Sequence, residues 1–120
     1  MNRPPTAFQT RVYNAVRRIP EGKVTTYRLL GETIGCGSAR AVGGALKRNP
    51  FAPEVPCHRV IATDRTIGGF AGASEGPEIT RKLGLLEAEG VRFDDRAKVA
   101  PDNIVALEPS ADDELSLVIA

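Results

Sequence analysis

The stretch from residue 25 to residue 48 reads TTYRLLGETIGCGSARAVGGALKR. Threonine at its start and Ser38 in its middle are residue types that cap helix N-termini, and Gly35 is typical of a helix end. The spacing predicts two short helices, over residues 27–34 and 39–48, joined by a tight glycine-containing turn. Two short helices joined in this way are typical of a helix-turn-helix.

The second of these predicted helices is nearly free of bulky side chains. Alanine and glycine fill five of its first seven positions, and Gly43 and Gly44 lie inside it. Each interior glycine costs a helix about 1 kcal/mol relative to alanine. Either another helix packs closely against this backbone, or another molecule approaches it. The sequence leaves both interpretations open.

Upstream of this stretch, Thr6 and Gln9 have the spacing of a capping box. Apolar residues then recur at helical spacing, which predicts an amphipathic helix over residues 7–18.

Downstream, the residue pattern predicts a short strand over residues 58–62 and a returning strand over residues 66–70. Pro77 opens a last amphipathic helix that Gly90 ends, and residues 91–93 read as a further strand. We therefore predict a mainly α fold with a small β element.

The chain has 120 residues, of which 42% are hydrophobic, enough for one domain with its own core. It holds no run of about 18 apolar residues and no charged-then-apolar leader, so we expect neither a membrane span nor secretion. We expect an intracellular protein, in the nucleus of a eukaryote or the cytoplasm of a prokaryote.

Two cysteines, Cys36 and Cys57, have the number needed for one disulfide, but free thiols are expected in an intracellular protein. One histidine, two cysteines and no CxxC pair do not complete a common zinc site. We expect no metal and no cofactor, and we expect Cys36 to be incidental.

Charge is distributed unevenly along the chain. Residues 1–60 carry ten basic and three acidic side chains, whereas residues 61–120 carry six basic and twelve acidic ones. A domain polarised in this way can turn a basic face toward phosphates, although the charges can equally spread over the folded surface.

The five residues Pro56-Cys57-His58-Arg59-Val60 hold the only histidine of the chain beside one of its cysteines. The thiolate is the nucleophilic form of cysteine, and a neighbouring imidazole generates it at neutral pH. A cysteine–histidine pair is a weak signal by itself. Its place about ten residues after the predicted helix-turn-helix makes it informative.

This order of motifs resembles the C-terminal, DNA-binding domain of the O6-alkylguanine-DNA alkyltransferases, the methylated-DNA–protein-cysteine methyltransferases. The Ser-Ala-Arg-Ala-Val-Gly-Gly-Ala run from Ser38, followed by Pro-Cys-His-Arg-Val, carries the resemblance. It covers residues 6–93, which implies a winged-helix-like helix-turn-helix domain there. Residues 94–120 would then form a C-terminal extension, disordered in part.

The resemblance implies a role for each of five residues. Cys57 would accept the alkyl group from guanine O6 as a stable thioether, so the protein would act once. His58 would be the general base, reached through a bridging water, and Glu89 would orient it. Tyr27 would donate a hydrogen bond to the departing guanine base, and Asn49 would brace the turn before the active site.

The resemblance also implies a DNA surface and a substrate pocket. Arg40 would take the place of the flipped nucleotide, since O6 is unreachable for this attack inside a paired duplex. The small-residue helix would enter the minor groove, and basic residues would contact phosphates. The proposed DNA-binding residues are Arg28, Ala39, Arg40, Ala41, Gly43, Gly44, Lys47 and Arg48, and the pocket residues are Pro56, Val60, Gly69, Phe70 and Ala71.

Duplex DNA containing O6-alkylguanine, or more weakly O4-alkylthymine, is the expected partner of a monomeric protein. The N-terminal domain usual in the family is not expected here. Short chains of this kind also resemble the alkyltransferase-like proteins, which commonly carry tryptophan in place of Cys57 and pass lesions to excision-repair proteins. A cysteine hydrolase and a plain helix-turn-helix regulator remain weaker alternatives, the latter leaving Cys57 unexplained.

Overall fold

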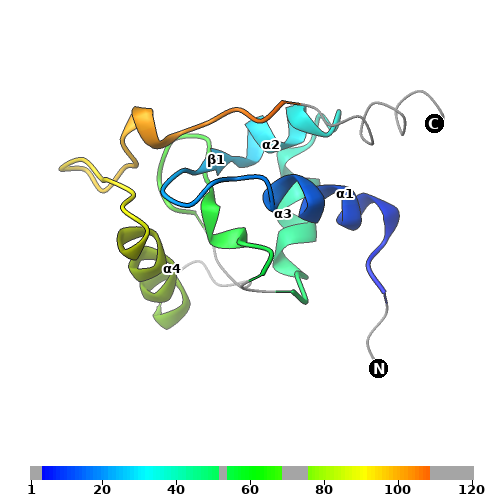
Figure 1. Cartoon of the computed structure of the whole chain (residues 1–120), viewed down its shortest axis with the longest axis horizontal. Coiled ribbons are helices and arrows are strands. Elements are labelled where there is room, and N and C mark those ends of the chain that lie inside the picture. Colours follow the sequence, from blue (N-terminus) through cyan, green and yellow to red (C-terminus); the bar gives the residue numbers. More distant parts are fainter. Residues whose placement is uncertain (1–3, 52–53, 69–75, 109–120) are drawn as a thin grey trace.

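The computed structural model describes residues 4–51, 54–68 and 76–108 of the chain (Figure 1). It is mainly helical, with a small two-stranded sheet. The helices are α1 (Ala7–Val16), α2 (Tyr27–Thr33), α3 (Ala39–Lys47) and α4 (Pro77–Ala88); the strands are β1 (Thr25–Thr26) and β2 (Val60–Ile61); and the 3-10 turns are η1 (Cys57–Arg59) and η2 (Pro101–Asn103).

Side-chain caps begin three of the helices, as the sequence predicts. Thr6 Oγ1 accepts a hydrogen bond from the Gln9 amide at 3.1 Å, and Gln9 Oε1 accepts one from the Thr6 amide at 2.9 Å, which completes the capping box of α1. Thr26 caps α2 and Ser38 caps α3, each through a 3.1 Å bond from a backbone amide. Because these bonds are local, residue type and spacing were enough to predict them.

The short sheet differs from the prediction. β2 covers only Val60–Ile61, because Cys57–Arg59 forms a 3-10 turn in which the Arg59 amide donates to Pro56 O at 2.9 Å. The described part of the predicted return, residues 66–68, contains no strand. β2 instead pairs in parallel with β1. A parallel partner lies far away along the chain, so local spacing could not reveal it.

The sheet separates two apolar clusters. In register, Thr25 lies opposite Val60 and Thr26 opposite Ile61. Val60 belongs to the first cluster and Ile61 to the second, because successive strand residues point to opposite faces. The buried members of the first cluster come mainly from α1, α2 and α3: Val12, Tyr13, Ala15, Val16, Ile19, Leu30, Ile34, Val42, Ala45, Leu46, Val55 and Val60.

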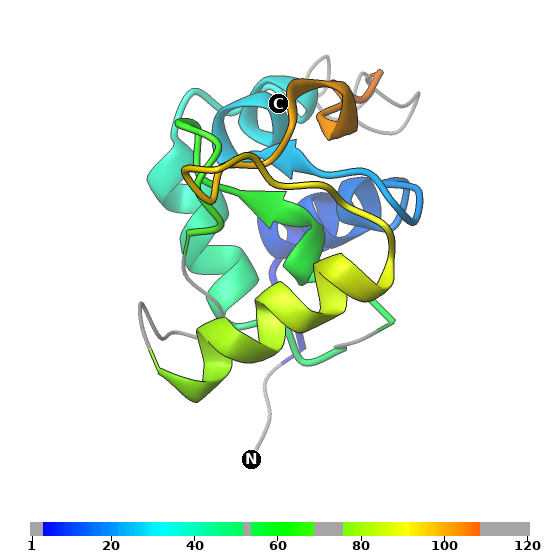
Figure 2. The same cartoon turned by 90° about the vertical axis from the view of Figure 1, so that its left-hand side faces the viewer.

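The second cluster joins α4 to the far side of the sheet. Its buried members are Val24, Ile61, Leu86, Val91 and Val99. Figure 2 shows α4 lying against the η1 turn, so one end of the fold brings the Cys-His-Arg turn and the last helix together. None of the helices in the described part of the chain is long and apolar enough to cross a membrane.

Residues 94–108 pack back onto the preceding domain and run past β1 and α2 (orange in Figure 1). Val24 forms a parallel bridge with Ile104. The buried Asn103 donates to Gly22 O at 3.0 Å and accepts from the Arg92 amide at 3.2 Å. This segment therefore completes the second cluster. The domain boundary at residue 93 stays a prediction, and residues 109–120 lie outside the described part.

Candidate active site

Cys57 begins the η1 turn and has a free, half-buried thiol. Its amide donates to Val55 O at 2.8 Å, which holds the turn tight after Pro56. Because residues 57–59 form a 3-10 turn, His58 does not begin the strand that the sequence predicts over residues 58–62. The turn leaves Cys57 partly exposed while the adjacent His58 is buried.

His58 and Glu89 form a buried pair. His58 Nε2 lies 2.9 Å from Glu89 Oε2, and the two side chains are only 6% and 13% exposed. Glu89 is the C-cap of α4, and Gly90 follows it with φ of 88°, in the left-handed region where glycine ends a helix. The sequence therefore placed Glu89 at a helix end, and the structure brings it to the histidine.

Arg59 holds the same carboxylate from the other side, and the sequence reasoning gave it no role. Its Nε lies 2.9 Å from Glu89 Oε1 and its Nη2 lies 2.8 Å from Oε2, so the guanidinium grips both oxygens. Its Nη1 donates to Ile19 O at 2.8 Å. The sequence signal was an arginine inside the predicted strand, directly before Val60. An arginine that becomes buried there needs an opposite charge nearby.

The pairing keeps Glu89 ionised. Burial raises the pKa of the Glu89 carboxyl, but hydrogen bonds from Arg59 and His58 and the charge of Arg59 outweigh burial and hold the pKa below its usual value. The hydrogen bond with Glu89 raises the pKa of Arg59. Both shifts have the sign expected of one close ion pair.

Tyr27 opens α2 and packs against the first cluster together with Cys57. Burial, and then the negative charge of the Cys57 thiolate, raise the pKa of the Tyr27 phenol. The phenol is therefore neutral at physiological pH and can donate a hydrogen bond.

Lys82 of α4 was also missed by sequence reasoning, although its spacing from Leu86 puts it on the inner face of the helix. It is completely buried. Its Nζ donates to Val60 O at 2.8 Å and also to Ile67 O. Burial lowers the pKa of Lys82 to about 8, against an opposing effect of the Cys57 charge.

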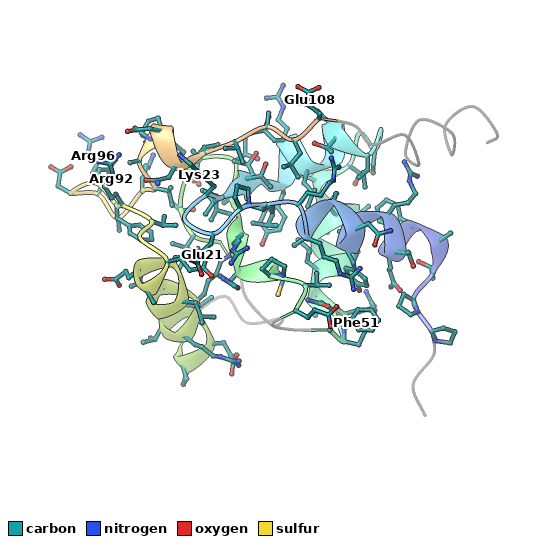
Figure 3. The ribbon with its side chains drawn as sticks, in the orientation of Figure 1. Glu21, Lys23, Phe51, Arg92, Arg96 and Glu108 are labelled. Atoms are coloured by element: carbon teal, nitrogen blue, oxygen red, sulfur yellow. The ribbon has the colours of Figure 1, made fainter. Side chains whose placement is uncertain are left out.

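Asn49 lies in the loop between α3 and the active-site turn. Its Nδ2 donates to Val55 O at 3.0 Å, and its Oδ1 accepts from the Phe51 amide at 2.9 Å. Phe51 is 38% exposed beyond the end of α3 (Figure 3), with its ring 5.9 Å from Tyr13 in an edge-to-face contact. The position of Asn49 suits the bracing role, which stays a prediction.

The candidate DNA-binding residues of α3 gather on its outer face. Ala39, Arg40, Ala41 and Lys47 are exposed, while Val42, Ala45 and Leu46 point into the core. A Cβ built on Gly43 would meet nothing within 4 Å among the described residues, and one on Gly44 would meet only Arg48 Nη1 at 3.9 Å. Close packing within the described chain therefore does not account for these glycines.

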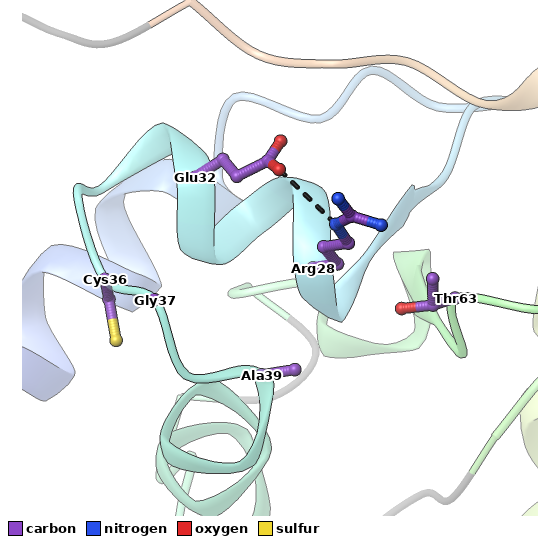
Figure 4. A pocket seen from close by; sticks show the side chains of 6 residues that line it. All are labelled: Arg28, Glu32, Cys36, Gly37, Ala39 and Thr63. Carbon is purple, nitrogen blue, oxygen red and sulfur yellow. Dashed lines mark ion pairs between the residues drawn. The ribbon is translucent and has the colours of Figure 1, made fainter.

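A groove of about 340 Å³ lies between α2, the start of α3 and the loop after β2 (Figure 4). Arg28 lies in it and forms an exposed ion pair with Glu32 at 3.4 Å. The lining residues are Arg28, Glu32, Cys36, Gly37, Ala39 and Thr63. The groove thus joins two candidate DNA-binding residues, Arg28 and Ala39, on one surface.

The pocket residues are only partly described. Pro56 and Val60 are buried, with Val60 inside the first cluster. Gly69, Phe70 and Ala71 lie outside the described residues. Just before them, Gly68 has φ of 71°, and a Cβ there would lie 3.4 Å from the Tyr27 ring. In residues 4–51, 54–68 and 76–108, no three His, Cys, Asp or Glu residues are grouped to hold a metal.

Comparison with known proteins gives a consistent result. The sequence profile of the 6-O-methylguanine DNA methyltransferase DNA-binding domain matches residues 7–91. A methylated-DNA–protein-cysteine methyltransferase from Sulfolobus acidocaldarius is 49% identical over 87 residues, which are 72% of this chain and 52% of that protein. One from Mycobacterium leprae is 46% identical over 85 residues, 70% and 48% of the two chains. The chain spans about half the length of these relatives.

Two solved structures extend the comparison. The Mycobacterium tuberculosis OGT in complex with DNA superposes with a TM-score of 0.65 at 43% identity, over 72% of this chain and 52% of that one. The S. pombe Atl1 bound to damaged DNA containing O6-carboxymethylguanine superposes with a TM-score of 0.68 at 34% identity. It matches 82% of this chain and 94% of its own length.

Proposed function

The chain belongs to the 6-O-methylguanine DNA methyltransferase family through its DNA-binding domain, and on that premise we propose that it repairs DNA by taking the alkyl group of O6-alkylguanine onto Cys57. One observation carries the proposal. A partly exposed cysteine begins the η1 turn, and the next residue is an imidazole buried against an ionised carboxylate. This is the nucleophile, base and orienting group that thiol alkylation needs.

The proposed reaction is a single displacement. His58 takes the thiol proton of Cys57 through a bridging water, and the sulfur attacks the carbon bonded to guanine O6. The carbon–oxygen bond breaks as the carbon–sulfur bond forms, and its electron pair leaves with guanine. Tyr27 donates a hydrogen bond to the base as that negative charge develops, and guanine then gains a proton. The thioether has no easy leaving path, so each molecule reacts once.

The proposed DNA interaction uses α2 and α3 as a winged-helix-like helix-turn-helix. The small outer face of α3 fits the minor groove, which is about 6 Å wide. Arg40 fills the stack where the alkylated nucleotide has flipped out, and Arg28, Lys47 and Arg48 contact phosphates. Minor-groove reading is degenerate, so repair is expected to depend little on sequence, and O4-alkylthymine is repaired more weakly.

Mass spectrometry of the intact protein tests this function directly. The protein is incubated with duplex DNA that holds one O6-methylguanine, and the same duplex with guanine is the control. A gain of one methyl per protein, mapped to the peptide that contains Cys57, is the expected result. A methyl found on Cys36, or release of methylated base with no mass gain, contradicts the proposal.

A second candidate function comes from the likeness to Atl1, which superposes with a TM-score of 0.68 at 34% identity and is bound to damaged DNA in its structure. An alkyltransferase-like function would be recognition of the lesion without transfer, followed by recruitment of excision repair. Tight binding of the lesion duplex with no change in protein mass is the result expected of that function. The free thiol of Cys57 favours transfer.

A further inference from the structure

The Glu89 carboxylate receives hydrogen bonds from two cations or potential cations at once. Within the described residues, His58 Nε2 and Arg59 Nη2 both lie against Oε2, at 2.9 and 2.8 Å, and Arg59 Nε lies against Oε1 at 2.9 Å. The orienting carboxylate is therefore shared between a base and a second, permanent positive charge.

Arg59 is fixed independently of Glu89. Its third contact, from Nη1 to Ile19 O at 2.8 Å, ties it to the backbone that follows α1. The Arg59 side chain in the ion pair is only 16% exposed. It therefore connects three segments that are distant in sequence: the turn after α1, the η1 turn and the C-terminal end of α4.

The charge of Arg59 bears on the protonation of His58. A carboxylate that faces only an imidazole favours the imidazolium, because the two opposite charges attract. When Arg59 already neutralises that carboxylate, a proton on His58 adds a second positive charge to the same site. The guanidinium therefore offsets the attraction that the Glu89 carboxylate alone would exert on a proton at His58.

Other charged groups surround this site. Cys57 precedes His58 on η1, Tyr27 of α2 and Lys82 of α4 interact electrostatically with Cys57, and Glu21 of the turn after α1 interacts with Arg59. Among the described residues, the side-chain hydrogen bonds to the Glu89 carboxylate come from His58 and Arg59. Arg59 is thus the cation closest to the His58–Glu89 pair.

We propose that Arg59 is a positioning residue for alkyl transfer: it holds the Glu89 carboxylate in place beside His58, and its charge offsets the attraction of that carboxylate for a proton on His58. The inference rests on the proposed function, in which His58 is the base. It adds a residue that touches neither substrate nor thiol proton and acts through Glu89.

The chain offers a direct test, because His58 is its only histidine. NMR titration of the imidazole therefore reports this one group without assignment and without DNA. Replacing Arg59 with methionine removes the charge and keeps much of the aliphatic volume. We expect the midpoint of the His58 titration to move upward by about one on the pH scale, the size expected for loss of one adjacent charge.

Arg65→Met is the matched control. Arg65 also donates to a backbone carbonyl, Val99 O at 3.0 Å, and also faces a carboxylate, Asp94 at 3.9 Å, but it contacts neither His58 nor Glu89. Its loss should leave the His58 midpoint unchanged. An equally large change in Arg65→Met would show a general effect of net charge and would overturn the inference.

Two further variants separate charge from geometry and guard against misfolding. Arg59→Lys keeps the charge but cannot grip both Glu89 oxygens, so we expect a midpoint near that of the wild type with a slower transfer. Glu89→Gln removes the carboxylate, so the His58 midpoint should move to lower pH, opposite to Arg59→Met. General loosening of the fold cannot move the midpoint in two opposite directions.

Transfer kinetics complete the test. The rate of single-turnover methyl transfer is measured against pH for wild type and Arg59→Met. We expect the acid limb of the profile to move to higher pH together with the titration midpoint, so that the rate at a fixed pH on that limb falls by about tenfold. A purely structural role for Arg59 would lower the rate at every pH without moving the limb, and that result overturns the inference.

Failure of this inference is distinguishable from failure of the proposed function. Wild-type transfer with an unmoved His58 midpoint in folded Arg59→Met contradicts the role of Arg59 alone. A wild-type protein that binds the lesion and never gains a methyl contradicts the proposed function, and the role of Arg59 in transfer is then wrong with it.

Discussion

Helix α3 presents Ala39, Arg40 and Ala41 to solvent, whereas α4 turns Lys82 and Glu89 inward against the active-site turn. On α4, each inward charge has partners within the chain: backbone carbonyls for Lys82, and Arg59 with His58 for Glu89. On α3, the glycine positions face open space. Burying a charge is costly unless it is paired, and both of these buried charges on α4 are paired within the chain.

The difference teaches how the two tasks are divided. The α3 surface presents a backbone with few bulky side chains and two exposed cations, Arg40 and Lys47. The α4 side fixes Glu89 and Lys82 against the Cys57–Arg59 turn and the strand that follows it. Changes on α4 should therefore alter chemistry and folding together, while changes on α3 should alter DNA recognition and leave the fold intact.

The largest expected effect separates the two regions completely. Cys57→Ala removes the nucleophile and leaves α3 untouched, so methyl transfer should fall to zero while duplex binding persists. Intact mass and a binding titration on the same O6-methylguanine duplex measure the two properties. Cys36→Ala is the control and should transfer like the wild type. Methylation of the Cys57→Ala protein would mean that another residue is the acceptor.

Lys82→Met tests the buried side through pH. Because the pKa of Lys82 is lowered from 10.5 to about 8 in the folded state, the unfolded chain binds more protons between those values. The free energy of unfolding of the wild type should rise across this window, by at most about 3 kcal/mol. The variant should lack that rise.

Urea unfolding at several pH values checks the slope, and the difference between the two proteins cancels the other titrating groups. Lys47→Met, at an exposed position on α3, should follow the wild-type curve. A Lys82→Met curve parallel to the wild type from about pH 8 to pH 10.5 would show that Lys82 titrates normally in the fold.

Arg40→Ala tests the outer side. Base flipping is needed for duplex DNA and not for a free base, so transfer from duplex O6-methylguanine should slow by at least about tenfold. Transfer from free benzylguanine should change little. Arg96→Ala, at another exposed arginine, serves as the control and should leave both rates unchanged. Equal losses of Arg40→Ala on the two substrates would remove the flipping role.

The smallest expected effect compares two helix glycines. Alanine at Gly43 meets open space, so the free energy of unfolding should rise by about 0.5–1 kcal/mol. Alanine at Gly31 of α2 would place its Cβ 2.7 Å from Cys36 O, so that variant should be destabilised. Urea unfolding of both variants measures the contrast. A destabilised Gly43→Ala protein would mean that α3 is closely packed within the chain after all.

Sequence reasoning worked best where the structure depends on neighbours in the chain. The caps at Thr6, Thr26 and Ser38, and the glycines that end α2 and α4, all follow from bonds or backbone angles within a few residues. It was wrong about residues 58–59, where the η1 turn replaces the start of the predicted strand. The Cys57 amide donates its hydrogen bond to Val55 O and the Arg59 amide donates to Pro56 O, so these amides are not available to a sheet ladder.

The site divides in the same way. The family motifs selected Cys57 and His58, which are adjacent, and Glu89, which stands at a helix end. Arg59 and Lys82 were overlooked, because their importance lies in the carbonyls and carboxylate that they meet across the fold. Residue type and spacing report what a side chain is able to do, and only its partners show whether that ability is used.

The sequence by itself determined the helices, their caps, the cysteine–histidine pair and the small outer face of α3, because each depends on residue type over a span of a few positions. Tertiary structure alone decided that β2 pairs with β1, that residues 94–108 close the second cluster, and that Arg59 grips Glu89. These contacts join segments tens of residues apart. They form because burial of the two apolar clusters brings those segments together, and no local pattern encodes which of them will meet.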